Sequence, residues 1–194
     1  MSERPYYEEQ EFRTSEERRR PPRKKSGGAL EYLIILVVSF ALVFGFVRPF
    51  VVEAFWIPSG SMIPTLEIGD RVLVNKFIYR FTDPKRGDII VFRSVDGSNE
   101  DLIKRVVALP GDTVAVRHGT LILNGKPQKE PYTNKNLPDR SFYAQITVPK
   151  GHVFVMGDNR GNSADSRVFG PLPMKNIEGE AFLRFWPPHR IGLL

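Results

Sequence analysis

The sequence LIKRVVALPGDTVAVRHGTLILNGKP, residues 102–127, contains the clearest secondary-structure pattern of the chain. Three short apolar runs lie at residues 102–109, 113–117 and 120–123, and they are separated by the turn residues Pro-Gly-Asp and His-Gly. Short apolar runs bounded by turn residues are typical of β-strands. The Asn-Gly pair at 124–125 supplies the positive φ angles of a type I′ turn, so the sequence predicts a β-hairpin there.

The same pattern extends in both directions along the chain. Only residues 76–81 and 175–177 suit short helices, while residues 131–143 are polar and rich in Pro and Asn, which indicates an exposed loop. We expect one mainly β domain over residues 53–194, with residues 112–150 as a small inserted lobe. The further strand-like runs are residues 71–75, 88–92, 145–148, 152–156 and 180–185.

An apolar segment precedes this domain. Residues 32–47, YLIILVVSFALVFGFV, carry no charge, and extension to residues 29–52 adds only Glu31 and Arg48. The uncharged part alone gives about 24 Å of helix, short of a hydrocarbon core of about 30 Å, and the extended segment reaches that length. The alternative, a buried helix of a soluble domain, would show a polar stripe, which this segment lacks. We therefore expect a transmembrane anchor over residues 29–52.

Basic residues ahead of the segment indicate its orientation. RRRPPRKK at residues 18–25 holds six basic residues in eight. By the positive-inside rule, residues 1–28 form a cytoplasmic tail, whose mixed charges, Pro and Ser are typical of disorder, and the domain lies across the membrane. DNA binding by this run is an alternative, but membrane topology and an anionic lipid surface account for it. A cleavable secretory signal is a second alternative, which the long tail and the Arg48-Pro49 break disfavour.

The composition excludes several kinds of chemistry. The chain has 194 residues, 28 Lys and Arg against 22 Asp and Glu, three His and no Cys. Without Cys there is no disulfide framework, Cys-ligated zinc, iron–sulfur cluster or thiol nucleophile. The net charge of +6 does not come from a basic cluster on the folded domain, so we expect no nucleic-acid partner, and we expect no metal or cofactor. A hydrolase would use Ser or Asp, and a Ser-His-Asp triad through His118 or His152 stays open.

Three segments differ from ordinary loops. The first, FWIPSGSMIPTL at residues 55–66, holds the hydroxyls of Ser59 and Ser61 close together among apolar residues. Taken alone, it is explained equally well as an ordinary Ser/Gly turn that leads into the first strand.

The second segment is LIKRVVALPGD at residues 102–112. Strand alternation puts Lys104 on the same face as the apolar Leu102, Val106 and Ala108. Burial there would lower the pKa of the lysine, as a lysine general base requires. The alternative is an edge-strand lysine that guards against aggregation.

The third segment, MGDNRGNSADSR at residues 156–167, is dense in Asp, Asn, Ser and Arg. Such runs form tight loops held by side-chain hydrogen bonds. Asp158, Asn162 and Asp165 offer oxygens for a calcium ion, but their spacing does not match an EF-hand. We favour a structural network that supports a nearby site.

In this order and after a single anchor, these segments resemble type I signal peptidase, the bacterial leader peptidase family of serine endopeptidases with a Ser/Lys dyad. The match covers residues 55–170, and five motifs in order are far more specific than any one of them. The resemblance implies a signal-peptidase-like, mainly β fold that follows one N-terminal transmembrane helix. The matching motifs are PSGSMIPTL (58–66), GDRVLVNK (69–76), RGDIIVF (86–92), KRVVALPGD (104–112) and GDNRGNSADSR (157–167).

The resemblance also implies roles for single residues. Ser61 corresponds to the nucleophile and Lys104 to the general base. The Ser59 hydroxyl corresponds to the group that stabilises the oxyanion together with the Ser61 backbone N–H. Ser163 corresponds to the residue that orients the lysine by a hydrogen bond. The implied supporting ion-pair network is Asp158, Asp165 and Arg167, and the implied walls of the pockets for small substrate side chains are Ile57 and Ile103.

The implied function is a membrane-bound serine endopeptidase. It would cleave N-terminal signal peptides from exported preproteins after a small-x-small motif of the Ala-x-Ala type. Its partners would be secretory preproteins and the lipid bilayer, with no cofactor, and its site would lie outside the cell membrane that its single helix crosses.

Three alternatives belong to other classes. A conjugation or mitochondrial inner-membrane processing peptidase would use the same dyad on fewer substrates. A soluble self-cleaving Ser/Lys repressor is disfavoured by the anchor and by the lack of a helix-turn-helix. A membrane-tethered β module that only binds would keep its function in Ser61→Ala and Lys104→Ala variants.

Overall fold

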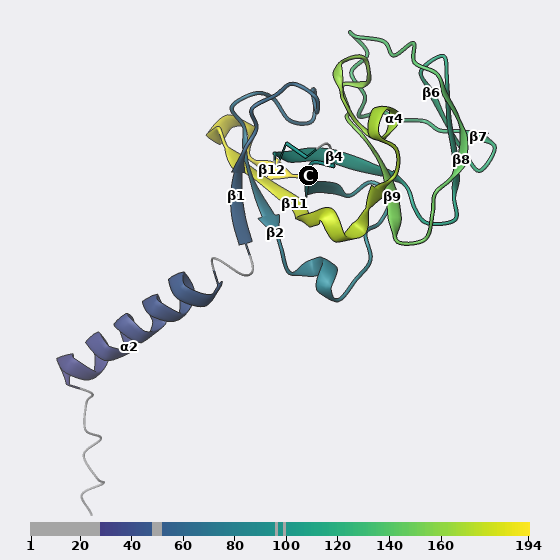
Figure 1. The fold of residues 1–194 in the computed structure, drawn as a ribbon. Coiled ribbons are helices and arrows are strands. Elements are labelled where there is room, and N and C mark those ends of the chain that lie inside the picture. The colour runs from purple at the N-terminus through teal and green to yellow at the C-terminus, as the bar shows by residue number, and fades with distance from the viewer. Residues whose placement is uncertain (1–27, 48–51, 96, 99) are drawn as a thin grey trace, which may run out of the picture. The chain divides into compact units, whose positions relative to one another are not determined.

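The computed structural model describes residues 28–47, 52–95, 97–98 and 100–194. The chain divides into two units, Met1–Val43 and Phe44–Leu194. The described part of the first unit is helical and that of the second is rich in β-strands (Figure 1).

The helical segment consists of α2, Ala29–Leu42, followed by the π-helical η1, Val43–Val47. The side chains of α2 are exposed and, apart from Glu31, Tyr32 and Ser39, they are apolar. These helical elements cover residues 29–47 of the predicted span of residues 29–52. Val52 begins a strand, and residues 48–51 lie outside the described part. Among the described residues, no helix combines the length and apolar character needed to cross a membrane.

A large antiparallel sheet forms the body of the second unit. Its strand order is β1-β2-β11-β3-β4-β9-β10, and β12 pairs with β11. Strand β4 therefore lies in the interior of the sheet, between β3 and β9. The strands are β1 Val52–Trp56, β2 Arg71–Asn75, β3 Ile89–Arg93, β4 Asp101–Ala108, β9 His152–Met156, β10 Leu172–Pro173, β11 Ile177–Trp186 and β12 Gly192–Leu193.

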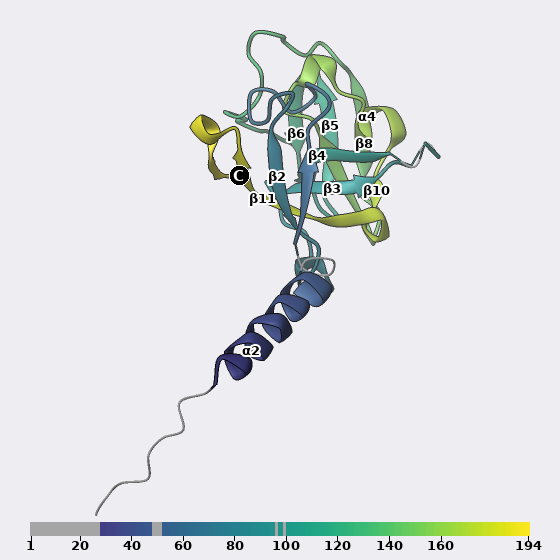
Figure 2. The same cartoon turned by 90° about the vertical axis from the view of Figure 1, so that its left-hand side faces the viewer.

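A smaller sheet with the order β7-β6-β5-β8 lies behind β1 and β2 when the unit is viewed from the β1 side (Figure 2). Asn124 and Gly125 both have positive φ angles, 51° and 76°, so the predicted turn is present between β6 and β7. The sheet falls within the stretch 112–150 that the sequence marks as an inserted lobe. Its strands are β5 Thr113–Arg117, β6 Thr120–Leu123, β7 Lys126–Pro127 and β8 Tyr143–Thr147.

The prediction of a mainly β fold is confirmed. The predicted strands 71–75, 113–117, 120–123 and 152–156 have the observed bounds, and β3, β4, β8 and β11 differ from prediction by one to three residues at an end. Strand β1 was not predicted, because its sequence VEAFW follows the apolar segment without a turn. The short helix η2, Ile78–Arg80, lies within the predicted residues 76–81, and η4, Met174–Asn176, begins and ends one residue before the predicted residues 175–177. The short elements that the sequence did not indicate are β10, β12, η3 Arg160–Asn162, α4 Ser166–Phe169 and η5 Pro188–Arg190.

The apolar core covers both faces of the central strands. On β3, Ile89 and Val91 pack in one buried cluster, and the alternate residues Ile90 and Phe92 pack in another. Strand alternation sends neighbouring side chains to opposite faces, so both faces of β3 are covered. The sheet at β3 is thus enclosed between two apolar clusters.

Candidate active site

Ser61 lies in the irregular segment between β1 and β2. Two backbone hydrogen bonds close the base of this segment: Ile57 N–H donates to the Asp70 carbonyl and Gly69 N–H to the Ile57 carbonyl, each at 2.9 Å. Met62 and Leu66 are fully buried in the core cluster below the segment. Because its two ends are tied together and its apolar side chains are packed, the segment holds Ser61 in one place.

Lys104 reaches Ser61 from β4. Its Nζ atom lies 2.9 Å from the Ser61 Oγ atom and donates to the Ile103 carbonyl at 2.9 Å. Lys104 is 3% exposed, so it does not present its charge to solvent, and the alternative of a lysine that guards a strand edge against aggregation is wrong. The fold thus joins two side chains that are 43 residues apart in the sequence.

Burial determines the protonation of this lysine. It lowers the pKa of Lys104 from 10.5 to about 8, while the charge of Asp165 acts weakly in the opposite direction. Removal from water penalises the charged ammonium more than the neutral amine. At pH 7 the fraction of neutral amine is therefore about one in ten, against about one in three thousand at a pKa of 10.5.

Arg105, the next residue on β4, contacts a carboxylate, whereas Lys104 contacts a hydroxyl and a carbonyl. Its Nε and Nη2 atoms donate to the two carboxylate oxygens of Asp158 at 2.9 and 2.7 Å. Asp158 is fully buried and also accepts a 2.5 Å hydrogen bond from the Thr65 hydroxyl. The Arg105 guanidinium stacks over the ring of Tyr132, 4.2 Å from its centroid. This pair ties the Ser61 segment, β4 and the end of β9 together.

Asn159 holds the Ser61 segment by its backbone and by its side chain. Its backbone N–H donates to the Ser61 carbonyl at 3.0 Å, and its Nδ2 atom donates to the Gly60 carbonyl at 2.8 Å. Its Oδ1 atom accepts from Asn134 at 3.2 Å. The sequence assigned no role to Asn159, and its position inside the dense polar run 156–167 was the only signal.

The predicted ion-pair network is present as two separate clusters. Arg167 pairs with Asp165 at 2.8 Å and with Asp139 at 2.7 Å. Asp158 is bonded to Arg105 instead of Arg167. The loop between β7 and β8 supplies Asp139 to this pairing, and it also supplies Glu130, which pairs with Arg160 at 2.6 Å. Sequence reasoning missed Arg105, Glu130 and Asp139 because their partners are distant in the chain.

Ser163 is close to the pair but does not contact Lys104 by a hydrogen bond. Its Oγ atom is buried, and in the part of the chain that the structure describes it has no hydrogen-bond partner. A Cβ atom at Gly157 would lie 2.3 Å from this Oγ atom and 2.5 Å from the Ser61 carbonyl oxygen. Only glycine permits this approach, so Gly157 sets the distance between Ser163 and the Ser61 segment.

The remaining predicted residues surround Ser61. Ser59 is exposed, and neither its hydroxyl nor the Ser61 backbone N–H is engaged in a hydrogen bond among the described residues. Ile57 and Ile103 are 2% and 8% exposed and belong to the core cluster that contains Met62. Within the described ranges, no three His, Cys, Asp or Glu side chains gather as a ligand set for a metal ion.

Comparison with known proteins gives consistent matches. The family model described as "Signal peptidase, peptidase S26" matches residues 29–186. Signal peptidase I of Leptolyngbya laminosa is 46% identical over 155 residues, which are 76% of this chain and 75% of the relative. Probable signal peptidase I-1 of Synechocystis sp. is 49% identical over 154 residues, which are 76% of this chain and 78% of the relative.

Among solved structures, a signal peptidase I from Enterococcus faecalis is 36% identical, with a TM-score of 0.45 over 51% of this chain and 97% of that chain. The family match and the alignments to the two relatives each cover most of the chain. The region that the family model matches includes both Ser61 and Lys104. The chain therefore belongs to the signal peptidase family of serine peptidases, peptidase S26, as its motifs predict.

Proposed function

We propose that the chain is a membrane-bound endopeptidase that removes signal peptides from exported preproteins with Ser61 as nucleophile and Lys104 as general base. Signal peptidase activity follows from the family. The observation that carries the residue assignment is the 2.9 Å contact between the Lys104 Nζ and Ser61 Oγ atoms. A buried lysine with a pKa of about 8 supplies a neutral amine, which can accept a proton.

The proposed reaction proceeds in two steps through an acyl-enzyme. The Ser61 Oγ atom attacks the scissile carbonyl carbon while neutral Lys104 takes the hydroxyl proton. Protonated Lys104 then gives that proton to the leaving amine, and the C–N bond breaks. In the second step Lys104 removes a proton from a water molecule, the water attacks the ester, and the proton returns to Ser61. No histidine is required at any point.

Two donors are available for the oxyanion that forms in each step. The Ser61 backbone N–H and the Ser59 hydroxyl lie on the same segment, and neither has an acceptor among the described residues. Donors that are already free and fixed stabilise developing negative charge without reorganisation. We therefore assign the oxyanion hole to Ser59 and Ser61.

The substrate is proposed to bind as an extended strand. In the described sheet, β9 pairs with β4 only from Arg105 onward, so residues 101–104 have β3 as their sole neighbour. An extended peptide can add to such an edge by backbone hydrogen bonds. Ile57 and Ile103 fill the space beside the dyad, which favours small side chains before the cut and fits an Ala-x-Ala type of motif.

The chain is proposed to have three parts. Residues 1–28 form a cytoplasmic tail, residues 29–52 anchor the chain in the cell membrane, and residues 53–194 form the extracytoplasmic peptidase domain. The support is the uncharged run of residues 32–47 after a strongly basic run, together with the exposed apolar side chains of α2. A site tethered in this way would meet preproteins as they leave the membrane.

Cleavage of purified preproteins in detergent tests this function. The wild type should release the signal peptide, and Ser61→Ala and Lys104→Ala should not, while circular dichroism shows that both variants are folded. Near-normal turnover by either variant would disprove the dyad. The number of different preproteins that are cut distinguishes a general signal peptidase from a narrower processing peptidase.

A further inference from the structure

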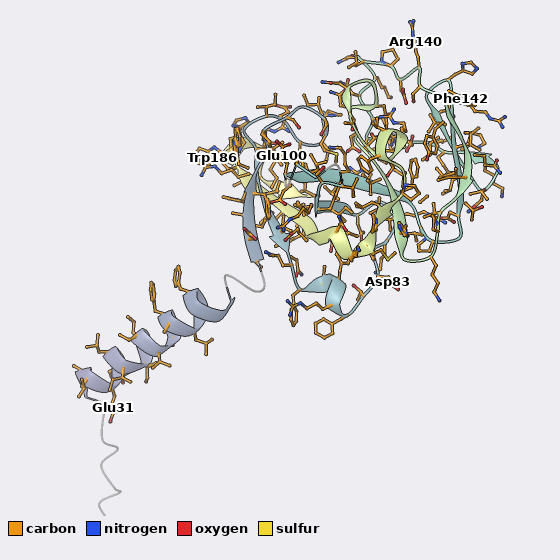
Figure 3. All side chains as sticks on the ribbon, in the orientation of Figure 1. Glu31, Asp83, Glu100, Arg140, Phe142 and Trp186 are labelled. Carbon is orange, nitrogen blue, oxygen red and sulfur yellow. The ribbon has the colours of Figure 1, made fainter. Side chains whose placement is uncertain are left out.

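A cavity lies away from the Ser61 and Lys104 pair. Its volume is about 740 Å³, and it opens where β2, β3 and β11 meet the short helices η2 and η4. The Ser61 segment is connected to the other end of β2, where Arg71 pairs with Trp186. Asp83, just after η2, and Trp186 lie on different sides of the unit (Figure 3). The cavity is lined by Lys76, Tyr79, Arg80, Arg93, Met174, Lys175, Asn176, Ile177 and Glu178.

The wall of this cavity carries more positive than negative charge. Glu178 is the one carboxylate in the lining, and it is shared by Lys76 at 3.6 Å and Arg93 at 3.1 Å. Arg80 and Lys175 have no carboxylate partner among the described residues. Two cations that face one cavity without counter-charge indicate a binding site for an anion.

Exposed aromatic rings lie beside these cations. The sequence KFIYRF at residues 76–81 alternates basic and aromatic or aliphatic residues. Phe81 is 72% exposed and Phe77 39%, and the two rings make an edge contact with centroids 4.7 Å apart. The Arg80 guanidinium lies over the Phe77 ring. Exposed aromatic residues next to cations are typical of segments that lie at a membrane–water interface.

The cavity also lies close to the start of β1, the first strand after the apolar helix in the chain. Asn75, next to Lys76 of the lining, pairs with Val52 at the start of β1. Val52 follows Val47 by five residues, a stretch that spans at most about 17 Å. A membrane anchor that ends near Val47 would therefore keep the cavity within reach of lipid headgroups.

We propose that this cavity binds the phosphate of an anionic phospholipid headgroup, with Arg80 and Lys175 as the principal ligands and Phe77 and Phe81 in the interface. The proposal rests on the membrane anchoring stated above. Its function would be to fix the orientation of the peptidase domain on an anionic membrane. Glu178 limits the affinity, because it neutralises part of the charge of Lys76 and Arg93.

The test measures lipid binding to the full chain in neutral detergent by native mass spectrometry. Phosphatidylglycerol should bind more tightly than phosphatidylcholine. The double variant Arg80→Gln, Lys175→Gln should lose about 10-fold or more in affinity for phosphatidylglycerol, because each cation near an anionic lipid surface contributes substantially to the free energy of binding. The control Arg117→Gln, Lys126→Gln removes two exposed cations from the small sheet and should change affinity less than about twofold. Equal losses in the two double variants would overturn the proposal.

Two further measurements make the result specific. Glu178→Gln should bind phosphatidylglycerol about threefold or more tightly, since it frees Arg93 and removes one negative charge from the lining, while Lys76 keeps its ion pair with Glu53 at 2.8 Å. Unchanged or weaker binding would contradict the assignment. Inorganic phosphate and glycerol phosphate carry the same kind of anionic group as the lipid. If either bound as tightly as phosphatidylglycerol, the ligand of the cavity would be a soluble phosphate and the proposal of a lipid headgroup would be wrong.

Failure of this inference and failure of the proposed function give different results. The double variant should still cleave preproteins in detergent, because neither residue contacts the dyad. Flotation of the full chain with neutral phosphatidylcholine vesicles depends on the anchor alone. Lost flotation would overturn the anchoring, whereas normal flotation with no preference for phosphatidylglycerol would overturn only the headgroup site.

Discussion

Lys104 and Arg105 are neighbours on β4, and both are largely buried, but their surroundings differ in kind. Lys104 contacts a hydroxyl and a carbonyl, and no carboxylate lies within hydrogen-bond distance of its Nζ atom among the described residues. Arg105 donates two hydrogen bonds to the buried carboxylate of Asp158. The two side chains point to opposite faces because they are consecutive residues of a strand.

This difference shows how one strand can supply both a base and a structural cation. Burial without a carboxylate partner lowers the pKa of Lys104 to about 8, so its amine can lose a proton near neutral pH. Guanidinium stays charged at any physiological pH, and its planar geometry matches a carboxylate. Arg105 therefore holds Asp158 and Thr65 in place on one face, while Lys104 is free to react on the other.

The largest expected effect comes from replacing the reactive lysine, Lys104, by arginine. Lys104→Arg should lower kcat/KM for preprotein cleavage by at least about 10³-fold, the same loss that is expected for Lys104→Ala, because guanidinium cannot act as a base. Arg105→Lys is the matched change on the opposite face, and it should keep measurable cleavage. Retention of more than a tenth of wild-type activity by Lys104→Arg would show that Lys104 is not the base.

Breaking the structural pair should reduce stability more than any other single change to the network. Asp158→Asn leaves the Arg105 charge buried without its partner, which should lower the free energy of unfolding by about 3–5 kcal/mol in urea titration. Glu178→Gln breaks an ion pair with the largely exposed Arg93 and should cost at most about 1 kcal/mol. A loss for Asp158→Asn as small as that of the control would mean that the pair does not hold the site together.

Removal of the Lys104 amine should raise the free energy of unfolding, whereas loss of the Asp158 charge should lower it. In the folded state the pKa of Lys104 is lowered, so the unfolded chain binds its proton more tightly. Burial of the ammonium therefore destabilises the fold below pH 8, and this penalty disappears as the pH rises toward 10.5. Lys104→Met should raise stability by about 1–3 kcal/mol at pH 7 and by less at pH 10, measured by urea titration at both values. Destabilisation at pH 7 would contradict the buried-ammonium account.

The smallest effect is expected from the ring that covers Arg105. Tyr132→Leu removes cation–π contacts with Arg105 and Arg160 and a hydrogen bond to Glu130, which should cost about 1 kcal/mol. Tyr132→Phe keeps the ring and should cost less. If the Phe variant were as unstable as the Leu variant, the hydroxyl and not the ring would be the important group.

Much of the fold could be predicted because its signals are local. Turn residues separate the strands, and the Asn124-Gly125 turn requires only two adjacent residues. Alternation within one strand placed Lys104 on an apolar face, although it left an edge-strand lysine as the alternative. Strand β1 was missed because no turn residue separates it from the apolar segment. Nothing in the local sequence therefore marks where the segment ends and the strand begins.

The contacts of the site could not be derived from local patterns. Ser61 and Lys104 were paired through the family resemblance, since no periodicity connects residues 43 positions apart. The partner of Asp158 was expected within its own segment and is Arg105, 53 positions away. The Asn159 contacts to the Ser61 segment depend on how two loops meet, which only the folded structure determines.

The pH dependence of kcat/KM for preprotein cleavage tests the role of Lys104 most directly. With burial lowering the pKa of Lys104 to about 8, the rate should rise with pH through a single ionisation near that value and level off above it. The sign follows from the mechanism, because the active form is the deprotonated amine. A rate that is independent of pH from 6 to 10, or one that still rises with a midpoint near the ordinary lysine pKa of about 10.4, would contradict the account.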